Sequence, residues 1–386
     1  MDNFDITVLV PTLNEEITIS EFIDSCRIGF EKLNLNGQII IADSSSDNTS
    51  KIAREKDVEV VTVPLKGLGN AYKAAIPYIK SQYVILGDAD LTYDFSNIEI
   101  FYNKLKDGYE FIVGNRFKGF IEEGAMPKSH QYFGSPATSW LLNLVFQTPV
   151  KDIHCGMRAI TTDALNRMNL VSKSWQYASE MIIKAKYLKL RTTEIPISFY
   201  KDRQGRISNL KRIGFWAPWH AGWITIQTIF TWGISQIFIP LGYLLIFLSL
   251  PLLITLYDGP TTIMKYELSL HSMMFLSLIF QVGFQLLMLG VVSKLFYEVS
   301  IEKPVIFLQF NYSIIIFIIL MIASILFLSP IFSVFYENSY TLPEKLGYES
   351  YYAVTGINLM ALGTAVFVYS LLYNLIFINR KNVENN

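Results

Sequence analysis

Two aspartates, Asp88 and Asp90, follow directly after the apolar run 83–86, in the stretch GDADLTYD. Carboxylates this close repel each other, and a D-x-D spacing lets both present oxygens to one hard divalent cation. Mg²⁺ favours such a partial protein shell, which substrate phosphates and water complete. On its own the spacing is a weak signal, because Asp is common in turns and helix caps. The surrounding residues must therefore decide between a metal site and a turn.

Three further polar clusters follow apolar, β-branched runs in the same way, namely TLNEE at 12–16, DSSSDNT at 43–49 and KGLGNA at 66–71. A carboxylate at a strand end, such as Asp43, can accept hydrogen bonds from a base or a ribose. Gly67 and Gly69 would let a nucleotide approach the backbone closely. Each cluster also has a structural interpretation, because Thr12 to Glu15 matches a helix capping box and a single G-x-G is common in loops.

These clusters need a scaffold that brings strand ends together, and the first 200 residues have its pattern. Short apolar runs, each followed by turn residues and a helix-compatible stretch, occupy 5–11, 37–43, 58–64, 81–88 and 108–115. Strands that alternate with helices predict an α/β domain with a mostly parallel sheet covered on both faces. In such open sheets ligands bind outside the carboxyl ends of the strands. We therefore expect the four polar clusters to line one crevice.

The chain after residue 212 has a different composition. Of the 32 Lys and Arg and 33 Asp and Glu residues, only 14 lie there, and charge-free runs cover 213–257, 268–293, 304–336 and 350–379. A helix needs about 20 apolar residues to cross a hydrocarbon core, and helices of soluble proteins are rarely apolar all round for so long. The sequence predicts an all-α domain of four transmembrane helices, near 233–257, 270–293, 306–334 and 354–378.

Basic residues indicate which side of the membrane faces the cytoplasm. Lys294 and Lys303 lie in a connection on one side, Arg380 and Lys381 follow the last span, and the opposite loops are acidic. By the positive-inside rule, the N-terminal domain and the C-terminus are cytoplasmic, as in an integral protein of the cell (inner) membrane. The two cysteines form no disulfide framework, which fits a reducing cytosol. A net charge of −1 argues against a nucleic-acid partner.

The junction between the two halves combines basic and aromatic residues. KDRQGRISNLKR, at 201–212, holds five basic residues against one acid and precedes FWAPWHAGWITIQTIFTW. This composition is typical of an approach to an anionic lipid bilayer, with the rings at headgroup depth. Residues 127–146 predict an amphipathic helix that would lie in the membrane interface or cover the core. The expected domains are a catalytic domain at 1–200, an interfacial segment at 201–232 and a transmembrane domain at 233–386.

In this order and at these spacings, VPTLNEE, ADSSSDNT, KGLGNA, GDADL and GNRF resemble the motifs of family-2 glycosyltransferases of GT-A fold. More narrowly, residues 5–212 are similar to polyprenyl-phosphate glycosyltransferases, the group of dolichyl-phosphate mannose and glucose synthases and their bacterial undecaprenyl-phosphate counterparts. The resemblance implies metal-dependent, inverting transfer of one hexose from a UDP- or GDP-linked nucleotide sugar to a polyprenyl phosphate.

The resemblance also implies roles for single residues. The nucleotide would contact Pro11, Thr12, Asn14, Glu15, Asp43, Ser45, Gly67, Gly69, Asp88 and Ala89. Asp88 and Asp90 would hold Mg²⁺ or Mn²⁺ against the donor diphosphate, where a metal offsets charge on the leaving group. The mannose synthases carry a glutamine two residues after the second aspartate, where this chain has Thr92. The third metal ligand is therefore open between water, Thr92 and Asp94.

Cationic residues would bind the phosphate of the acceptor, since arginine offers bidentate contacts to phosphate. The set expected to contact the acceptor phosphate or the sugar is Arg116, Lys128, His130, Asp152, Arg158, Glu180, Arg203 and Arg206. A phosphate monoester is already anionic at neutral pH, so catalysis by Asp90 and Arg116 would consist of positioning and charge stabilisation. His154 and Cys155 are more typical of packed core residues than of catalysts.

Other functions stay open at this point. A processive polysaccharide synthase typically carries a Q-x-x-R-W motif, which this sequence lacks, whereas transfer to a glycerolipid is excluded less firmly. A lipid carrier or flippase with a regulatory soluble domain would need polar groups in its spans. The spans here hold few strongly polar residues, among them Gln281, Gln285 and Asn311. Anchoring, with contacts between copies in a homo-oligomer, is the simpler role.

Overall fold

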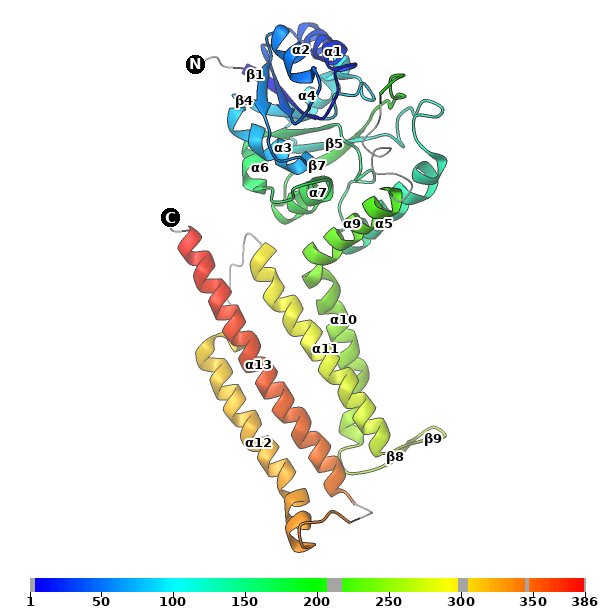
Figure 1. Cartoon of the computed structure of the whole chain (residues 1–386). Helices are drawn as coiled ribbons and strands as arrows, with labels where there is room; N and C mark the ends of the chain where they lie inside the picture. The colour runs from blue at the N-terminus through cyan, green and yellow to red at the C-terminus, as the bar shows by residue number, and fades with distance from the viewer. Residues whose placement is uncertain (1–3, 207–216, 298–304, 344–346, 385–386) are drawn as a thin grey trace. The chain divides into compact units, whose positions relative to one another are not determined.

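The computed structural model describes residues 4–206, 217–297, 305–343 and 347–384 (Figure 1). The chain divides into two units, Met1–Trp232 and Gly233–Asn386. The second unit thus begins where the sequence predicts the first membrane helix to begin. Of the expected interfacial segment, residues 207–216 lie outside the described residues.

A seven-stranded sheet forms the centre of the first unit. Its strands are β1 (Phe4–Thr12), β2 (Gly37–Asp43), β3 (Glu59–Thr62), β4 (Ser81–Leu86), β5 (Phe111–Asn115), β6 (Arg158–Thr161) and β7 (Thr192–Pro196). They lie in the order β3-β2-β1-β4-β6-β5-β7, and all pairs are parallel except those of β6, which runs antiparallel to β4 and to β5. Val8, Leu9 and Val10 are all fully buried, so both faces of the sheet are covered.

The helices of this unit are α1 (Ile19–Lys32), α2 (Thr49–Glu55), α3 (Leu68–Ala75), α4 (Glu99–Lys106), α5 (Ser135–Phe146), α6 (Thr162–Met168), α7 (Tyr177–Tyr187) and α9 (Ala217–Trp232). Short turns are η1 (Ile76–Tyr78), η2 (Phe95–Asn97) and η3 (His130–Gly134). The rings of Phe22 and Phe95, 4.8 Å apart, join α1 to η2, and those of Tyr72 and Tyr177, 4.7 Å apart, join α3 to α7.

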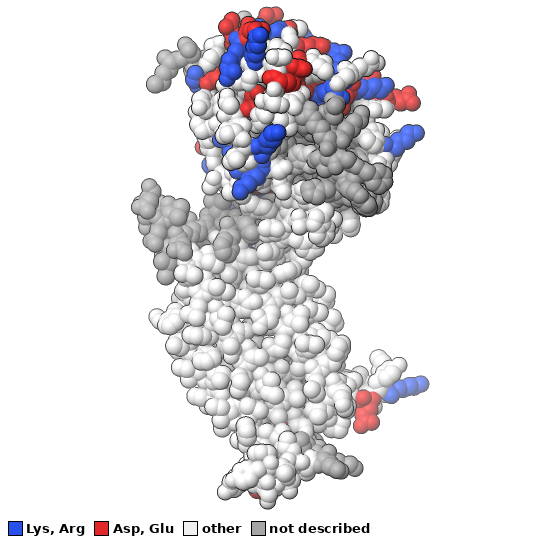
Figure 2. All heavy atoms as spheres, in the orientation of Figure 1, with Lys and Arg blue, Asp and Glu red and all other residues white. Residues whose placement is uncertain are grey.

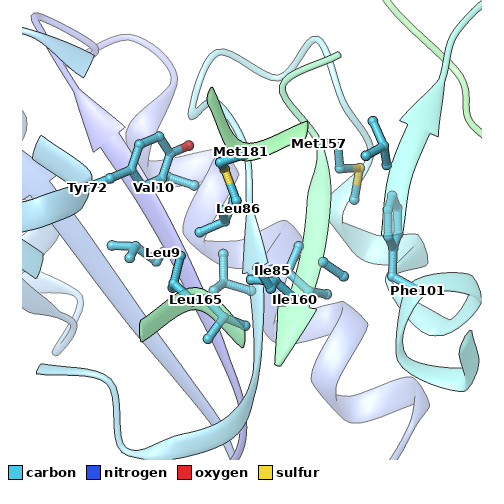
Figure 3. Packing of buried hydrophobic residues seen from close by; sticks show 14 of the residues in the cluster. Leu9, Val10, Tyr72, Ile85, Leu86, Phe101, Met157, Ile160, Leu165 and Met181 are labelled. Atoms are coloured by element: carbon cyan, nitrogen blue, oxygen red, sulfur yellow. The ribbon is translucent and has the colours of Figure 1, made fainter. Parts of the chain in front are cut away.

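Apolar side chains from strands and helices form one continuous core in this unit. Figure 3 shows part of it, with Leu9 and Val10 of β1, Ile85 and Leu86 of β4 and Ile160 of β6 packed among residues of the helices. Since Leu86 is the last residue of β4, the polar stretch that follows it begins directly at the edge of the core.

The observed helices bear on two local expectations. The capping-box interpretation of Thr12 to Glu15 is wrong, because α1 begins at Ile19 and its N-cap is Thr18. The amphipathic helix expected at 127–146 is realised as η3 and α5. One face of α5 is buried, while Trp140 on the other is 65% exposed, so packing on the core leaves an apolar surface free.

The second unit consists of α10 (Ile234–Thr255), α11 (Leu270–Tyr297), α12 (Phe310–Glu337) and α13 (Glu349–Glu384), with the turn η4 (Ile306–Leu308) and a hairpin of β8 (Thr261–Ile263) and β9 (Tyr266–Leu268). All four helices are long and apolar enough to cross a membrane. Gly242 and Gly283 allow α10 and α11 to approach closely, since a β-carbon on Gly242 would sit 2.7 Å from the Gly283 carbonyl oxygen.

Charge is distributed as the sequence predicts. On the face drawn in Figure 2, charged side chains gather on the α/β unit and are almost absent along the helices of the second unit. The expected fold class, an α/β domain with a mostly parallel sheet followed by four apolar helices, is confirmed.

Candidate active site

The aspartate pair lies directly after β4, at the carboxyl edge of the sheet. Asp90 Oδ1 accepts hydrogen bonds from the Thr92 amide at 3.0 Å and from the Thr92 hydroxyl at 2.6 Å. Asp94 Oδ1 instead caps the turn η2 by accepting from the amide and the hydroxyl of Ser96. Of the two side chains considered as a third metal ligand, Thr92 therefore contacts Asp90, whereas Asp94 caps the turn η2.

Asp88 occupies a confined position beside Asp90. Gly156 packs directly against its carboxylate, and the Tyr72 hydroxyl donates to the carbonyl of the preceding Gly87 at 3.1 Å. Burial, and then repulsion from Asp90, raise the pKa of the Asp88 carboxyl to about 7. A cation beside the pair would relieve both effects.

The loops expected to bind the nucleotide meet at the ends of β1 and β2. The hydroxyls of Thr12 and Ser45 donate to Asp43 Oδ1 at 2.6 and 2.5 Å, and the Ser50 hydroxyl donates to Oδ2. The Asn14 amide donates to Ser45 Oγ at 2.7 Å, from a left-handed backbone with φ of 59°. Four predicted nucleotide residues thus form one hydrogen-bonded cluster, and Asp43 is oriented by hydroxyls of the chain itself.

Glu15, which we expected at the nucleotide, forms an ion pair with Arg206. The guanidinium makes two parallel bonds, Nε to Oε2 and Nη2 to Oε1, each 2.6 Å long, and the side chains of both residues are buried. The third nitrogen, Nη1, lies 2.6 Å from Asp202 Oδ1 and 3.3 Å from Asp90 Oδ2. Arg206, which we expected at the acceptor phosphate, therefore lies between the donor loop and the aspartate pair.

Arg203 also differs from the expectation. Its guanidinium forms an ion pair with Glu21 on α1, and both side chains are more than half exposed. This contact lies on the outer surface of the domain.

Arg116, directly after β5, is fixed by a buried ion pair. Asp152 accepts from Nε at 2.8 Å and from Nη2 at 2.7 Å, and it also accepts from the Arg116 amide at 3.0 Å. Burial alone would lower the pKa of Arg116, but Asp152, followed by Tyr93, more than offsets this effect, and the pKa lies above the usual value. Asp152 is fully buried, so it positions Arg116 and does not line an acceptor crevice.

Two histidines lie near Arg116. Burial and then Arg116 lower the pKa of His154 to about 4, so this ring is neutral at pH 7, and its Nε2 is 2.8 Å from the Thr138 hydroxyl on α5. The same two causes lower the pKa of His130. Lys128, two residues before His130, is exposed. His130 and Lys128 thus stay available for an anion, whereas His154 joins α5 to the turn before β6.

Arg158 and Glu180 have structural contacts in place of the acceptor contacts we expected. The guanidinium of Arg158 is fully buried and donates to three backbone carbonyls, those of Ile153, Cys155 and Ala178.

Glu180 is also fully buried. Its carboxylate accepts from the amides of Val171 and Ser172 at 2.8 and 2.9 Å and pairs with Lys184 at 2.7 Å. It therefore anchors the loop before α7.

The glycines of KGLGNA approach this same loop. A β-carbon on Gly67 would sit 2.3 Å from the Lys173 carbonyl oxygen, and one on Gly69 would sit 2.3 Å from that of Ser172. The close approach that we expected of a nucleotide is thus made by the chain itself. Pro11 lies on β1 in register with Ala42, and Ala89 is buried between the two aspartates.

Known proteins resemble a large part of this chain. A family model for glycosyl transferase family 2 matches residues 7–168. The low-salt glycan biosynthesis hexosyltransferase Agl6 of Haloferax volcanii is 31% identical over 289 residues, which are 75% of this chain and 68% of that protein. The chain belongs to glycosyltransferase family 2. It is a nucleotide-sugar transferase.

A further relative and a solved structure are also similar to this family-2 transferase. The dolichyl-phosphate hexose transferase of Haloferax volcanii is 28% identical over 204 residues, 52% of this chain and 85% of that protein. Among solved structures, glucosyl-3-phosphoglycerate synthase from Mycobacterium tuberculosis, in complex with Mn²⁺, UDP and glucosyl-3-phosphoglycerate, covers 60% of this chain and 80% of its own, with 18% identity and a TM-score of 0.46.

Three residues around the aspartate pair of this transferase were not predicted from the sequence. Gly156 and Tyr72 confine Asp88, and the Tyr93 hydroxyl accepts from the Gly156 amide at 2.9 Å. Gly156 follows the HC dipeptide that precedes β6, and a glycine beside a strand is a signal for close approach. Nothing in the local pattern identifies what it approaches.

Proposed function

We propose that this family-2 transferase moves a single hexose from a UDP- or GDP-linked sugar to a polyprenyl phosphate, with inversion, and that it uses Mg²⁺ or Mn²⁺. The observation that carries the proposal is the pairing of Asp88 and Asp90 beside the loops of β1 and β2, in a chain that continues into four membrane-length apolar helices. The name of the dolichyl-phosphate hexose transferase supports the same acceptor class.

The aspartate pair fits a metal that needs few protein ligands. The described residues contain no group of three or more His, Cys, Asp or Glu arranged to hold an ion. Mg²⁺ is usually bound by one or two carboxylates and keeps waters and substrate phosphates in its shell. Asp88 and Asp90 would supply this half-shell, and the cation would offset charge on the departing nucleoside diphosphate.

The transfer needs little acid–base chemistry from the protein. An anionic oxygen of the acceptor phosphate attacks the anomeric carbon, a C–O bond forms there, and the bond to the nucleoside diphosphate breaks on the opposite side, which inverts the centre. His154 is neutral and hydrogen-bonded to Thr138, which suits a positioning role. Catalysis then depends on orientation and on charge stabilisation.

Arg116, Lys128 and His130 would bind the acceptor phosphate. Asp152 holds Arg116 in one orientation. The positive charge of Arg116 acts to lower the pKa of both Asp88 and His130. His130 and the exposed Lys128 lie on the segment between β5 and β6. We propose these three residues as the phosphate subsite.

The polyprenyl acceptor would be reached from the cytoplasmic face of the cell membrane. The apolar spans are compatible with an anchor in the bilayer, and basic residues near their ends give the orientation by the positive-inside rule. The bilayer would also concentrate a lipid substrate beside the catalytic domain.

A product assay with purified protein tests the proposal. The protein is incubated with undecaprenyl or dolichyl phosphate, Mn²⁺ or Mg²⁺, and a panel of labelled UDP- and GDP-sugars, and the lipid product is separated by thin-layer chromatography. A polyprenyl phosphosugar resists mild alkali and breaks in mild acid, whereas an ester-linked glycerolipid product is destroyed by mild alkali.

Matched variants make the assay specific. Asp90→Asn should abolish transfer while the protein still accumulates in membranes. Asp94→Asn should retain it, because Asn caps a helical turn as well as Asp does. Full transfer by Asp90→Asn, or a product that only glycerolipid acceptors give, would contradict the proposal.

A further inference from the structure

We propose that the guanidinium of Arg206 contacts the Asp90 carboxylate when the metal is absent, and that it competes with the divalent metal for this carboxylate. The inference rests on the proposed metal-dependent function and extends it to the segment that leads toward the membrane helices. The guanidinium has all three nitrogens engaged, two by Glu15 and the third by Asp202 and Asp90. No acceptor phosphate needs to be assumed to explain its position.

The competition follows from which oxygen of Asp90 is free. Oδ1 already accepts two hydrogen bonds from Thr92. Oδ2 is the oxygen that remains for a cation, and Arg206 Nη1 lies 3.3 Å from it. Two cations at the same carboxylate oxygen repel each other strongly in a partly buried site. A metal bound at Oδ2 must therefore displace this contact.

Charge balance favours the exchange. One guanidinium faces Glu15, Asp90 and Asp202 directly and also influences Asp88. A single positive charge against the three carboxylates that it contacts leaves the cluster negative, so Arg206 stabilises the empty site only in part. A divalent cation adds two positive charges and can replace the weakest contact of Arg206.

The bonds to Glu15 determine how Arg206 moves. Breaking a buried ion pair is costly, so Arg206 keeps Glu15 and gives up the longer contact to Asp90. Gly205, with φ of 87°, and the exposed residues 201–205 give the chain room for this small rotation. The amide of Tyr200 remains bonded to the Thr92 carbonyl at 2.9 Å. Loading of the metal would thereby be coupled to the conformation of 201–206.

Metal affinity without donor or acceptor tests the proposal. Mn²⁺ binding to the purified full-length chain is measured by electron paramagnetic resonance of the free ion. Arg206→Gln should bind Mn²⁺ about tenfold more tightly, because a competing charge next to Asp90 is gone. The double variant Glu15→Gln/Arg206→Gln should also bind more tightly, and it avoids a buried unpaired carboxylate that could impair folding.

Arg203→Gln is the matched control. It removes the same unit of charge from the same segment, but from an exposed pair with Glu21, so its Mn²⁺ affinity should stay within about twofold of the parent. Unchanged or weaker binding by the double variant, or equal tightening by Arg203→Gln, would overturn the proposal. Failure of the lipid assay alone would reject the acceptor and leave this result standing.

Discussion

Gly156 lies so close to Asp88 that a β-carbon at this position would sit 2.3 Å from Asp88 Oδ2 and 3.2 Å from the Tyr93 ring. The glycine amide donates to the Tyr93 hydroxyl, so the backbone cannot retreat without losing this bond. We expect Gly156→Ala to displace the carboxylate and to lower transfer on the order of 100-fold, as misplacement by about 1 Å does in other enzymes.

The control for this change is Gly134→Ala, at the start of α5, where a β-carbon would meet nothing closer than 3.7 Å. Its transfer rate should match that of the parent protein. Initial rates with the donor identified in the panel assay provide the measurement, and Mn²⁺ affinity provides a second. Parental values of both in Gly156→Ala would show that Asp88 tolerates the methyl group.

The buried pair of Arg116 and Asp152 should dominate the response of this domain to mutation. Asp152→Ala leaves the guanidinium buried without its partner, which typically costs about 3–5 kcal/mol. Thermal unfolding of the detergent-solubilised protein should show a clear fall in the melting temperature of the α/β domain. Asp107→Ala removes an exposed pair with Lys104 and should cost less than about 1 kcal/mol. Equal melting temperatures of the two variants would contradict the structural role of Asp152.

His154 should make stability depend on pH in the acid range. Its pKa is about 4 in the folded protein, lowered by burial and then by Arg116, against roughly 6.5 in an unfolded chain. Between these values the unfolded chain binds more protons, so the stabilisation is complete above pH 6.5 and is lost as the pH falls towards 4.

The expected loss is as much as about 3 kcal/mol, since one pKa unit corresponds to ~1.4 kcal/mol. His154→Gln retains a polar partner for Thr138 and has no titrating ring. Its melting temperature should therefore fall less between pH 6.5 and 4.5 than that of the parent protein. Parallel pH profiles would rule out His154 as the source.

Both cysteines should be inert in the folded protein. Cys26 and Cys155 are buried and unpaired, and burial raises the pKa of Cys155 to about 12 and that of Cys26 well above its usual value. The thiolate is the reactive form. Iodoacetamide at pH 8 should therefore add no label to native protein and two labels after denaturation, as mass spectrometry can measure. Labelling of the native chain would show that one of these sites opens.

Local patterns predict much of this molecule. The first five strands and the membrane helices follow from runs of apolar residues, and the positions of Asp88 and Asp90 follow from the end of β4. Such features depend on residues adjacent in the chain. The capping-box interpretation also relies on adjacent residues, and it is wrong. Thr12 donates to Asp43 on the neighbouring strand and not to the helix that follows it in the chain. The strands β6 and β7 lie outside the runs that predict strands.

The partners of polar side chains are the part that the sequence does not predict. Arg158 and Glu180 have the residue types of a binding site, yet both satisfy backbone groups of their own chain. Arg206 and Glu15 are separated by 191 positions. Whether a buried charge faces a ligand or the protein depends on packing between distant segments, and one sequence does not specify it.

The antiparallel strand β6 has a consequence for the folding of the domain. It joins β4 to β5, and those two strands do not pair with each other. Before residues 158–161 are synthesised, only β3, β2, β1 and β4 can pair with one another, and β5 has no partner strand. Pairing of β6 with β4 closes a long stretch of chain, a contact of high sequence separation that forms slowly. Because Gly156 lies just before β6, Asp88 cannot acquire the environment seen here before β6 has been synthesised and paired.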